Sequence, residues 1–146
     1  MERTEIKIRK ATKKDLPACV EIMVEAFAGQ EDWTNERALV RLEEKIREAP
    51  QLCFCLEKDN NLIGLMFCEQ FDYAKGRYLW IAEFAIKPKE QGKGFGNQAL
   101  KFIEKFAKEN GFDVLYLAAN RKEKAYQMYL KRGFKDTEWF FMEKEL

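Results

Sequence analysis

Hydrophobic positions along the chain change between the spacing of helices and that of strands, and these changes predict the order of its elements. Residues 6–9 alternate as a half-buried strand does, and apolar side chains then recur at helical spacing over residues 16–27 and 34–49. Apolar runs separated by turn residues follow, and they predict an antiparallel meander of three strands over residues 52–57, 62–71 and 78–86.

The second half of the chain predicts two further helices, each followed by a strand. The clearest helical pattern covers residues 97–110 and leads into a buried type of strand at 114–118, so that this helix connects two parallel strands. A helix at 123–132 and an apolar strand at 139–142 complete the order β-α-α-β-β-β-α-β-α-β. The predicted fold class is a mixed α/β (α+β) fold, a mostly antiparallel β-sheet flanked by helices.

Length and composition indicate a single domain over residues 1–146. Hydrophobic residues make up 47% of the chain and charged residues 35%, a balance that is typical of a globular protein with a core. The 26 Lys and Arg residues and the 25 Asp and Glu residues leave a formal charge of +1. Because a dedicated nucleic-acid binder carries a clustered basic excess, we expect no nucleic-acid partner.

The residue types that are missing narrow the chemistry. The chain contains neither His nor Ser, which excludes Ser-His-Asp and Cys-His catalysis and histidine-bound metals, and we expect no metal. The cysteines Cys19, Cys53, Cys55 and Cys68 form no CxxC pair and are typical of core residues, with a reactive or disulfide role as the alternative. The first ten residues lack the apolar centre of a secretory signal, and no apolar stretch approaches the ~20 residues of a membrane span. We therefore expect a cytoplasmic protein without a membrane partner.

The most informative segment is the turn Gln91-Gly92-Lys93-Gly94-Phe95-Gly96-Asn97, which joins the strand at 78–86 to the next helix. Three glycines in five positions let the backbone approach a ligand closely and point its N–H groups outward. The start of a helix adds unpaired N–H donors and the positive end of the helix dipole, so the turn predicts a phosphate site rather than a flexible surface loop. No Walker motif is present, and the partial match to a dinucleotide fingerprint lacks the parallel strands and the acidic residue that such a site requires.

Two motifs resemble those of the GNAT N-acetyltransferase superfamily. Gln91-x-x-Gly94-x-Gly96 matches the R/Q-x-x-G-x-G/A signature of that family, and Ala125-x-x-x-Tyr129-x-x-x-Gly133-Phe134 is similar to its closing motif. The preceding strand end, Glu83-Phe84-Ala85-Ile86-x-Pro88, also has the usual form, and the order of elements fits over essentially the whole chain. The resemblance implies splayed fourth and fifth strands, and transfer of an acetyl group from acetyl-CoA to an amine.

By the same resemblance, the coenzyme lies in the splay and on the glycine turn. Backbone groups of Phe84, Ala85 and Ile86 would bond the pantetheine amides, and the N–H of Ile86 is the candidate oxyanion donor. The residues that would hold the pyrophosphate are those of the turn: Gln91, Gly92, Lys93, Gly94, Phe95, Gly96 and Asn97. Elementary electrostatics agrees, since two phosphates would meet a glycine-rich turn at a helix start.

The family often has an Asn seven residues before the tyrosine of the closing motif, in contact with the coenzyme. This chain has Lys122 at that position and Asn120 two residues earlier. Either Asn120 reaches the cofactor through a shifted loop, or the contact is lost. Arg121, Lys122 and Lys124 form a short basic run that either meets the 3′-phosphate or is a solvated helix start.

Tyr129 and Glu83 are the candidate catalytic residues. The position of Tyr129 in the closing motif implies contact with the coenzyme and the role of general acid toward its thiolate; Tyr126, one turn earlier, is the fallback. Glu83 is the candidate base, because the chain has no His and burial would raise the pKa of a carboxyl group on this strand. Alternation puts Glu83 and Ala85 on one face unless a bulge intervenes, and that face either lines the cleft or meets solvent.

The expected acceptor is a primary amine on a small molecule or a peptide. In the family, the early helices and the turn before the fourth strand shape the acceptor site, here residues 27–33 and 71–78. Their acidic and aromatic side chains suit a cationic amine, and they are equally ordinary for loops. If Glu83 is not the base, bulk water or another carboxylate such as Glu69 or Asp72 takes the proton.

Two further alternatives stay open. A non-catalytic acyl-CoA-binding sensor or accessory subunit is the alternative to an enzyme, and Tyr129 together with Glu83 favours the enzyme. The aromatic residues Trp139, Phe140 and Phe141 of the predicted final strand fit either a homodimer interface or the core of one chain.

Overall fold

The N-terminal part of the protein, seen in a computed structural model that describes residues 4–146, holds one strand and two helices. Residues 1–3 begin the N-terminal stretch that lacks the apolar centre of a secretory signal, and they lie outside the described residues. Strand β1 (Lys7–Lys10) is followed by a 3₁₀ turn at 13–15, by α1 (Leu16–Ala26) and by α2 (Asn35–Glu48). Thr34 caps α2, because its hydroxyl accepts the N–H of Arg37 at 3.1 Å.

The remaining strands complete a single five-stranded sheet. Strands β2 (Cys53–Lys58), β3 (Asn61–Tyr73) and β4 (Gly76–Ile86) form the predicted meander. Helix α3 (Phe95–Glu109), strand β5 (Val114–Tyr116) and helix α4 (Lys124–Lys131) follow. The strand order is β1-β2-β3-β4-β5, antiparallel except for the parallel pair β4–β5. The predicted fold class, a mostly antiparallel sheet flanked by helices, is confirmed.

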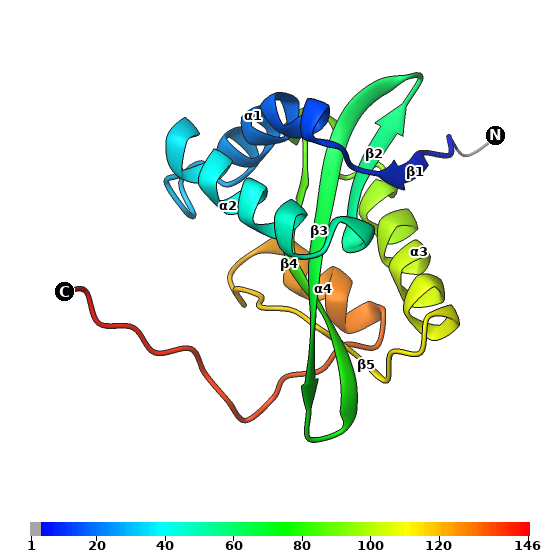
Figure 1. Cartoon of the computed structure of the whole chain (residues 1–146), viewed down its shortest axis with the longest axis vertical. Coiled ribbons are helices and arrows are strands. Elements are labelled where there is room, and N and C mark those ends of the chain that lie inside the picture. Colours follow the sequence, from blue (N-terminus) through cyan, green and yellow to red (C-terminus); the bar gives the residue numbers. More distant parts are fainter. Residues whose placement is uncertain (1–3) are drawn as a thin grey trace.

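Helices cover both faces of the sheet (Figure 1). Helices α1 and α2 pack on one face through buried side chains such as Met23 and Leu42, and α3 packs on the other through Leu100 and Ile103. All four cysteines are buried and form no disulfide, and burial raises the pKa of Cys53 to about 12, so these thiols are core residues. Within residues 4–146, no helix combines the length and the apolar character needed to cross a membrane.

A β-bulge in β4 decides which of its residues face which helices. Phe67 of β3 pairs with Glu83, whereas the next residue of β3 pairs with Ile81, so Ala82 has no partner. Because side chains alternate along a strand, this extra residue moves Glu83 to the face opposite that of Ile81. Glu83 therefore shares a face with Ala85, which packs with α1 and α2, while Ile81 packs with α3.

The C-terminal segment differs from the sequence prediction. Residues 139–142, predicted as a final strand, form none, and the chain from residue 135 onward is irregular and exposed. Strand β5 also ends at Tyr116 instead of residue 118. A strand needs a hydrogen-bonded neighbour, and the outer edge of β5 is paired with no other described strand. The apolar run at 139–142 thus has no neighbouring strand among the described residues.

Candidate active site

Strands β4 and β5 run side by side over only three residue pairs. Tyr78, Leu79 and Trp80 pair with the three residues of β5, and β4 then continues over residues 81–86 without a strand on that side. The predicted splay between the fourth and fifth strands is therefore present. It opens toward the end of β4 that leads into the glycine turn.

Backbone groups of Phe84 and Ile86 point into this splay. The N–H of Lys87 donates to the carbonyl of Ile63 on β3 at 2.8 Å, and successive strand residues direct their N–H and C=O groups to opposite sides. The backbone of Ala85, two residues before Lys87, therefore also points to β3. Three consecutive residues were expected to bond the pantetheine amides, and the geometry leaves Phe84 and Ile86 for that role.

The glycine turn has a backbone conformation that glycine adopts readily. Gly92 and Gly94 have φ angles of +75° and +88°, and Gly94 is the N-cap of α3, which begins at Phe95, two residues earlier than predicted. No side chain caps this end of the helix. Among the described residues, the N–H groups of Phe95, Gly96 and Asn97 have no hydrogen-bond acceptor. These donors and the helix dipole suit a phosphate group.

Side chains next to the glycines hold the turn against the sheet. Gln91 Nε2 donates to the carbonyl of Ile86 at 2.8 Å, which closes the turn over the end of β4. The Glu90 carboxylate pairs with Lys58 Nζ at 3.0 Å and with Lys93 Nζ at 3.4 Å. The motif residue Gln91 thus shapes the turn through its side chain and leaves the backbone N–H groups of the turn available to a ligand.

Glu83 lies on the face covered by α2, where its carboxylate meets Arg41. Arg41 Nε donates to Glu83 Oε1 at 3.1 Å, and 10% of the Glu83 side chain is exposed. Burial raises the pKa of Glu83 above its ordinary value, and the charge and hydrogen bond of Arg41 offset this only in part. A carboxylate of raised basicity is better suited to accept a proton near neutral pH than an exposed one.

A cavity of about 370 Å³, the α2 cavity, opens beside Glu83. Its other lining residues belong to α2 and the segment before it: Glu31, Trp33, Arg37, Val40, Arg41 and Glu44. Glu31 and Trp33 come from the early segment in which acceptor contacts were predicted. Residues 71–78, the other predicted segment, contribute nothing to this cavity.

Sequence reasoning did not single out the contribution of α2. Arg37, Arg41 and Glu44 follow one another at spacings of four and three residues, which places them on one face of a helix. That signal was available from the sequence. The contact of this face with Glu83 depends on the packing of α2 on the sheet, which the spacing does not contain.

The two substitute carboxylates lie in other surroundings. Glu69 pairs with Lys45, a buried lysine of α2. Burial lowers the pKa of Lys45, but the hydrogen bond and charge of Glu69 outweigh it, so that this pKa lies above its ordinary value. Asp72 is exposed on β3 near the hairpin end and does not line the cavity beside Glu83. Glu83 is thus the carboxylate of the three that borders the α2 cavity.

Tyr129 lies on α4, across the sheet from Glu83. Its ring packs edge-on against Phe134 with the ring centres 5.8 Å apart, and burial raises the pKa of Tyr129 to about 12, so the hydroxyl keeps its proton at neutral pH. No described residue forms a hydrogen bond with this hydroxyl, which leaves it available to a ligand. Tyr126, the fallback, instead donates to the Asp136 carboxylate at 3.0 Å.

Asn120 has a structural role in the loop before α4. Its Oδ1 accepts the N–H of Lys122 at 2.9 Å, which fixes the turn that leads into the helix. The contact of Asn120 or Lys122 with the coenzyme stays a prediction. Groups of three or more carboxylate and thiol side chains arranged to hold a metal ion do not occur in the described part of the chain.

A family of known proteins matches most of the chain. Residues 16–134 match the model of the acetyltransferase (GNAT) family. The chain therefore belongs to this family, as the two sequence motifs predicted.

Individual relatives either match only part of the chain or share less than a quarter of its residues. Over 63 residues the chain is 35% identical to a tRNA(Met) cytidine acetyltransferase of Saccharolobus solfataricus; this match spans 43% of the chain and only 8% of that much longer protein. A predicted acetyltransferase of Clostridium acetobutylicum, solved with acetyl-CoA, superimposes with a TM-score of 0.75 at 24% identity and covers 95% of this chain and 96% of its own. The PaiA N-acetyltransferase of Thermoplasma acidophilum, solved with coenzyme A, gives 0.74 at 23% identity, with 93% of each chain covered. At these identities, the structures show a shared fold.

The Arg41–Glu83 pair makes a testable prediction about the pKa of Glu83. Replacing Arg41 with Gln removes the positive charge that stabilises the buried carboxylate, so the pKa of Glu83 should rise further above its ordinary value. Carboxyl-carbon NMR over a pH series measures this pKa directly. Arg47→Gln, an exposed position of the same helix, is the control and should leave it unchanged. A pKa that stays the same or falls in Arg41→Gln would contradict the pairing.

Proposed function

We propose that the protein is an acetyl-CoA-dependent N-acetyltransferase that acetylates a primary amine of a small molecule or a peptide. One observation carries the proposal: where β4 leaves β5, the N–H groups of Phe84 and Ile86 and the carbonyl of Phe84 face an open splay beside a glycine turn with unpaired N–H groups. Amides in the splay match the amides of a pantetheine arm, and the turn matches the pyrophosphate of the coenzyme. Membership of the acetyltransferase family supports this assignment.

The two faces of the sheet suggest separate paths for the two substrates. Glu83 and the α2 cavity lie on one face, and Tyr129 packs on the other, against the core that includes the buried residues of α3. An amine would therefore arrive from the α2 side, where the three carboxylates of the cavity outnumber its two arginines and lie beside the ring of Trp33, as a cationic group prefers. The thiol would leave toward the α4 side.

The proposed chemistry needs few groups, because a thioester is already activated. The neutral amine attacks the acetyl carbonyl carbon, and the N–H of Ile86 stabilises the negative oxygen that develops. Glu83 takes the proton of the amine, directly or through a water molecule. When the carbon–sulfur bond breaks, Tyr129 gives its proton to the thiolate, and the products are an amide and coenzyme A. Holding the two substrates in line accounts for the rest of the rate enhancement.

The glycine turn provides the test of coenzyme binding. In Gly94→Val, a branched side chain replaces glycine at φ +88° and fills the space that the phosphates would approach, so calorimetric affinity for acetyl-CoA should fall at least tenfold. Gly111→Val is the matched control, because Gly111 has a similar φ of +77° at the far end of α3. It should cost similar stability and leave the affinity unchanged. Equal affinity of a folded Gly94→Val protein would remove the turn from the binding site.

Product formation separates the enzyme from its alternatives. The wild-type protein, incubated with acetyl-CoA and a panel of amines, peptides and unmodified tRNA, should give an acetylated amine or peptide by mass spectrometry. Binding of acetyl-CoA without any product would indicate an acyl-CoA-binding sensor. The tRNA is included because a relative is a tRNA cytidine acetyltransferase, and product on tRNA alone would overturn the proposed acceptor class.

Loss of the Tyr129 hydroxyl should slow the chemical step. Tyr129→Phe removes the proposed proton donor, so kcat should fall by ~10²-fold while the affinity for acetyl-CoA changes little. Because the pKa of Tyr129 is about 12, the wild-type enzyme should lose no activity through this group between pH 7 and 10. Tyr126→Phe, which removes a hydroxyl bound to Asp136, is the control. A loss of kcat in Tyr126→Phe alone would transfer the role to Tyr126.

Removal of the Glu83 carboxylate should change the pH dependence of the reaction. Glu83→Gln should lower kcat/KM by ~10²-fold near pH 7 and remove the acidic limb that protonation of the Glu83 carboxylate causes in the wild type, so that only the fall caused by protonation of the acceptor amine remains. Above the pKa of the acceptor amine the defect should shrink, since the nucleophile arrives neutral. Glu43→Gln, on an exposed face of α2, is the control. A defect of the same size at every pH would show that Glu83 positions the substrate and does not take its proton.

A further inference from the structure

One stripe of α2 presents charged and apolar side chains to the α2 cavity in a fixed order. Arg37, Val40, Arg41 and Glu44 follow one another at spacings of three, one and three residues, which places all four on the same side of the helix. The volume of the cavity, about 370 Å³, lies within the range of small-molecule sites, which is roughly 300–1,000 Å³. The stripe therefore forms one wall of a space that suits a small molecule.

Arg37 is the arginine of this wall that has no partner. Arg41 is bound to Glu83 at 3.1 Å, whereas the guanidinium of Arg37 forms no ion pair and no hydrogen bond with another described residue. The carboxylates of Glu31 and Glu44 line the same cavity, and neither of them pairs with Arg37. A guanidinium offers five N–H donors in a planar fork that fits a carboxylate, so all the donors of Arg37 are left for a ligand.

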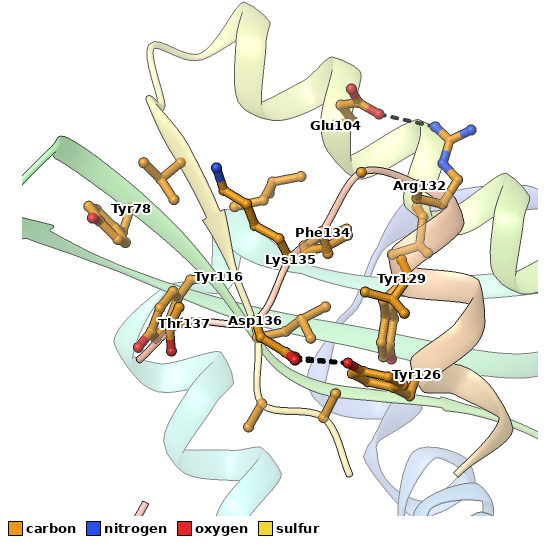
Figure 2. A pocket seen from close by; sticks show the side chains of 18 of the residues that line it. Tyr78, Glu104, Tyr116, Tyr126, Tyr129, Arg132, Phe134, Lys135, Asp136 and Thr137 are labelled. Carbon is orange, nitrogen blue, oxygen red and sulfur yellow. Dashed lines mark hydrogen bonds and ion pairs between the residues drawn. The ribbon is translucent and has the colours of Figure 1, made fainter. Parts of the chain in front are cut away.

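In a second cavity, by contrast, both arginines are paired. This cavity has a volume of about 800 Å³ and lies beside β5. Arg132 Nη2 donates to Glu104 at 3.0 Å, as Figure 2 shows, and Arg121 Nη2 donates to Asp136, also at 3.0 Å. Of the four arginines that line the two cavities, Arg37 alone has no carboxylate partner among the described residues.

The carboxylates of the α2 cavity lie near the proposed base. Glu44 follows Arg41 by one turn of α2 and forms no ion pair with any described residue. The Trp33 indole N–H donates to Glu31 Oε1 at 3.2 Å and holds that carboxylate at the cavity. Burial raises the pKa of Glu83, and the charge of Glu31 adds to this effect although Arg41 opposes it. A positively charged amine is therefore attracted to the Glu83 part of the cavity.

Arg37 lies one helical turn away from that part, toward the start of α2. It precedes Arg41 by four residues, which is roughly 6 Å along the helix axis. Long side chains on a helix lean toward its start, so the Arg37 guanidinium extends away from the one that holds Glu83. Val40, which is 53% exposed, lies between the two arginines on the stripe. A site for an anionic group and a site for an amine are thus about one turn apart, with apolar surface between them.

We propose that the α2 cavity selects an acceptor that carries a carboxylate as well as the reacting amine, and that Arg37 binds this carboxylate. This inference rests on the proposed function, because it takes the α2 cavity as the acceptor site. The acceptor is then a small amino acid in which a short aliphatic chain separates the two groups. Its carboxylate meets Arg37, its chain lies along Val40, and its amine reaches Glu83. Arg37 is the third residue of α2, so the positive end of the helix dipole adds to the attraction.

The same arrangement discriminates against other amines. A diamine would bring its second positive charge to the Arg37 guanidinium and would be repelled there. A plain alkylamine would leave the guanidinium without a partner and would gain nothing from it. Arg37 therefore favours an amino acid by attraction and disfavours a diamine by repulsion.

Acceptors of matched length test this selection. The protein is assayed with acetyl-CoA and glycine, β-alanine, γ-aminobutyrate or ε-aminocaproate, each beside the n-alkylamine that lacks only the carboxylate. For the longer amino acids, kcat/KM should exceed that of the matched amine by about tenfold or more, as expected for a hydrogen bond to a charged group. Glycine is too short to reach both Arg37 and Glu83 and should show no such preference. The absence of a preference for any of the amino acids would overturn the carboxylate site.

Variants of Arg37 show whether this side chain causes the preference. Arg37→Gln should abolish it, mainly by raising KM for the amino acid, because the lost contact is made in the bound substrate. Arg37→Lys should retain part of the preference, and Arg37→Glu should reverse it in favour of a diamine of the same length. Arg47→Gln, at an exposed position of α2 outside the cavity, is the control and should retain it in full. Circular dichroism verifies that each variant is folded.

The outcomes separate this inference from the proposed function. A preference that survives Arg37→Gln in full would overturn the role of Arg37, while acetylation of the amines would leave the proposed function standing. If neither these acceptors nor the wider panel of amines and peptides gives any product, the proposed function fails, and the inference fails with it.

Discussion

The parting of β4 from β5 after the Trp80–Tyr116 pair is the constraint on which the site depends. A strand that lost its neighbour in a folded core would ordinarily leave backbone groups unsatisfied at a cost in stability. Here the N–H groups of Phe84 and Ile86 and the carbonyl of Phe84 are left open where the chain enters the glycine turn, while Gln91 binds the carbonyl of Ile86. A ligand that carries its own amide groups and ends in phosphates would satisfy both features at once.

The bulge at Ala82 adds a second constraint, because it determines on which face of the sheet the Glu83 carboxylate lies. Without the extra residue, Glu83 would share the face of Ile81 and point into the apolar layer beneath α3. With it, the carboxylate meets Arg41 and borders a polar cavity, where a buried charge has a partner. One inserted residue therefore keeps a carboxylate on one face of the sheet and leaves the opposite face to Tyr129.

Local patterns in the sequence were sufficient to predict most of the fold and the glycine turn. Turn residues, helical periods and the spacing of Gln91, Gly94 and Gly96 are local signals, and the elements that they predict are present within a few residues. The bulge and the Arg41–Glu83 contact depend on register and on the packing of α2, which no local spacing contains. The predicted strand at 139–142 failed for a related reason: its apolar run indicates burial, but burial also requires a neighbour, and the chain does not supply one.

The helix that carries the proposed general acid is the one α-helix among the described residues without a buried residue. Tyr129 and Phe134 belong both to the closing motif and to the lining of a cavity of about 800 Å³ beside β5. A helix without buried residues is held by few contacts, and such elements open locally at low cost in free energy. The position of the proposed general acid therefore depends on contacts outside the buried core.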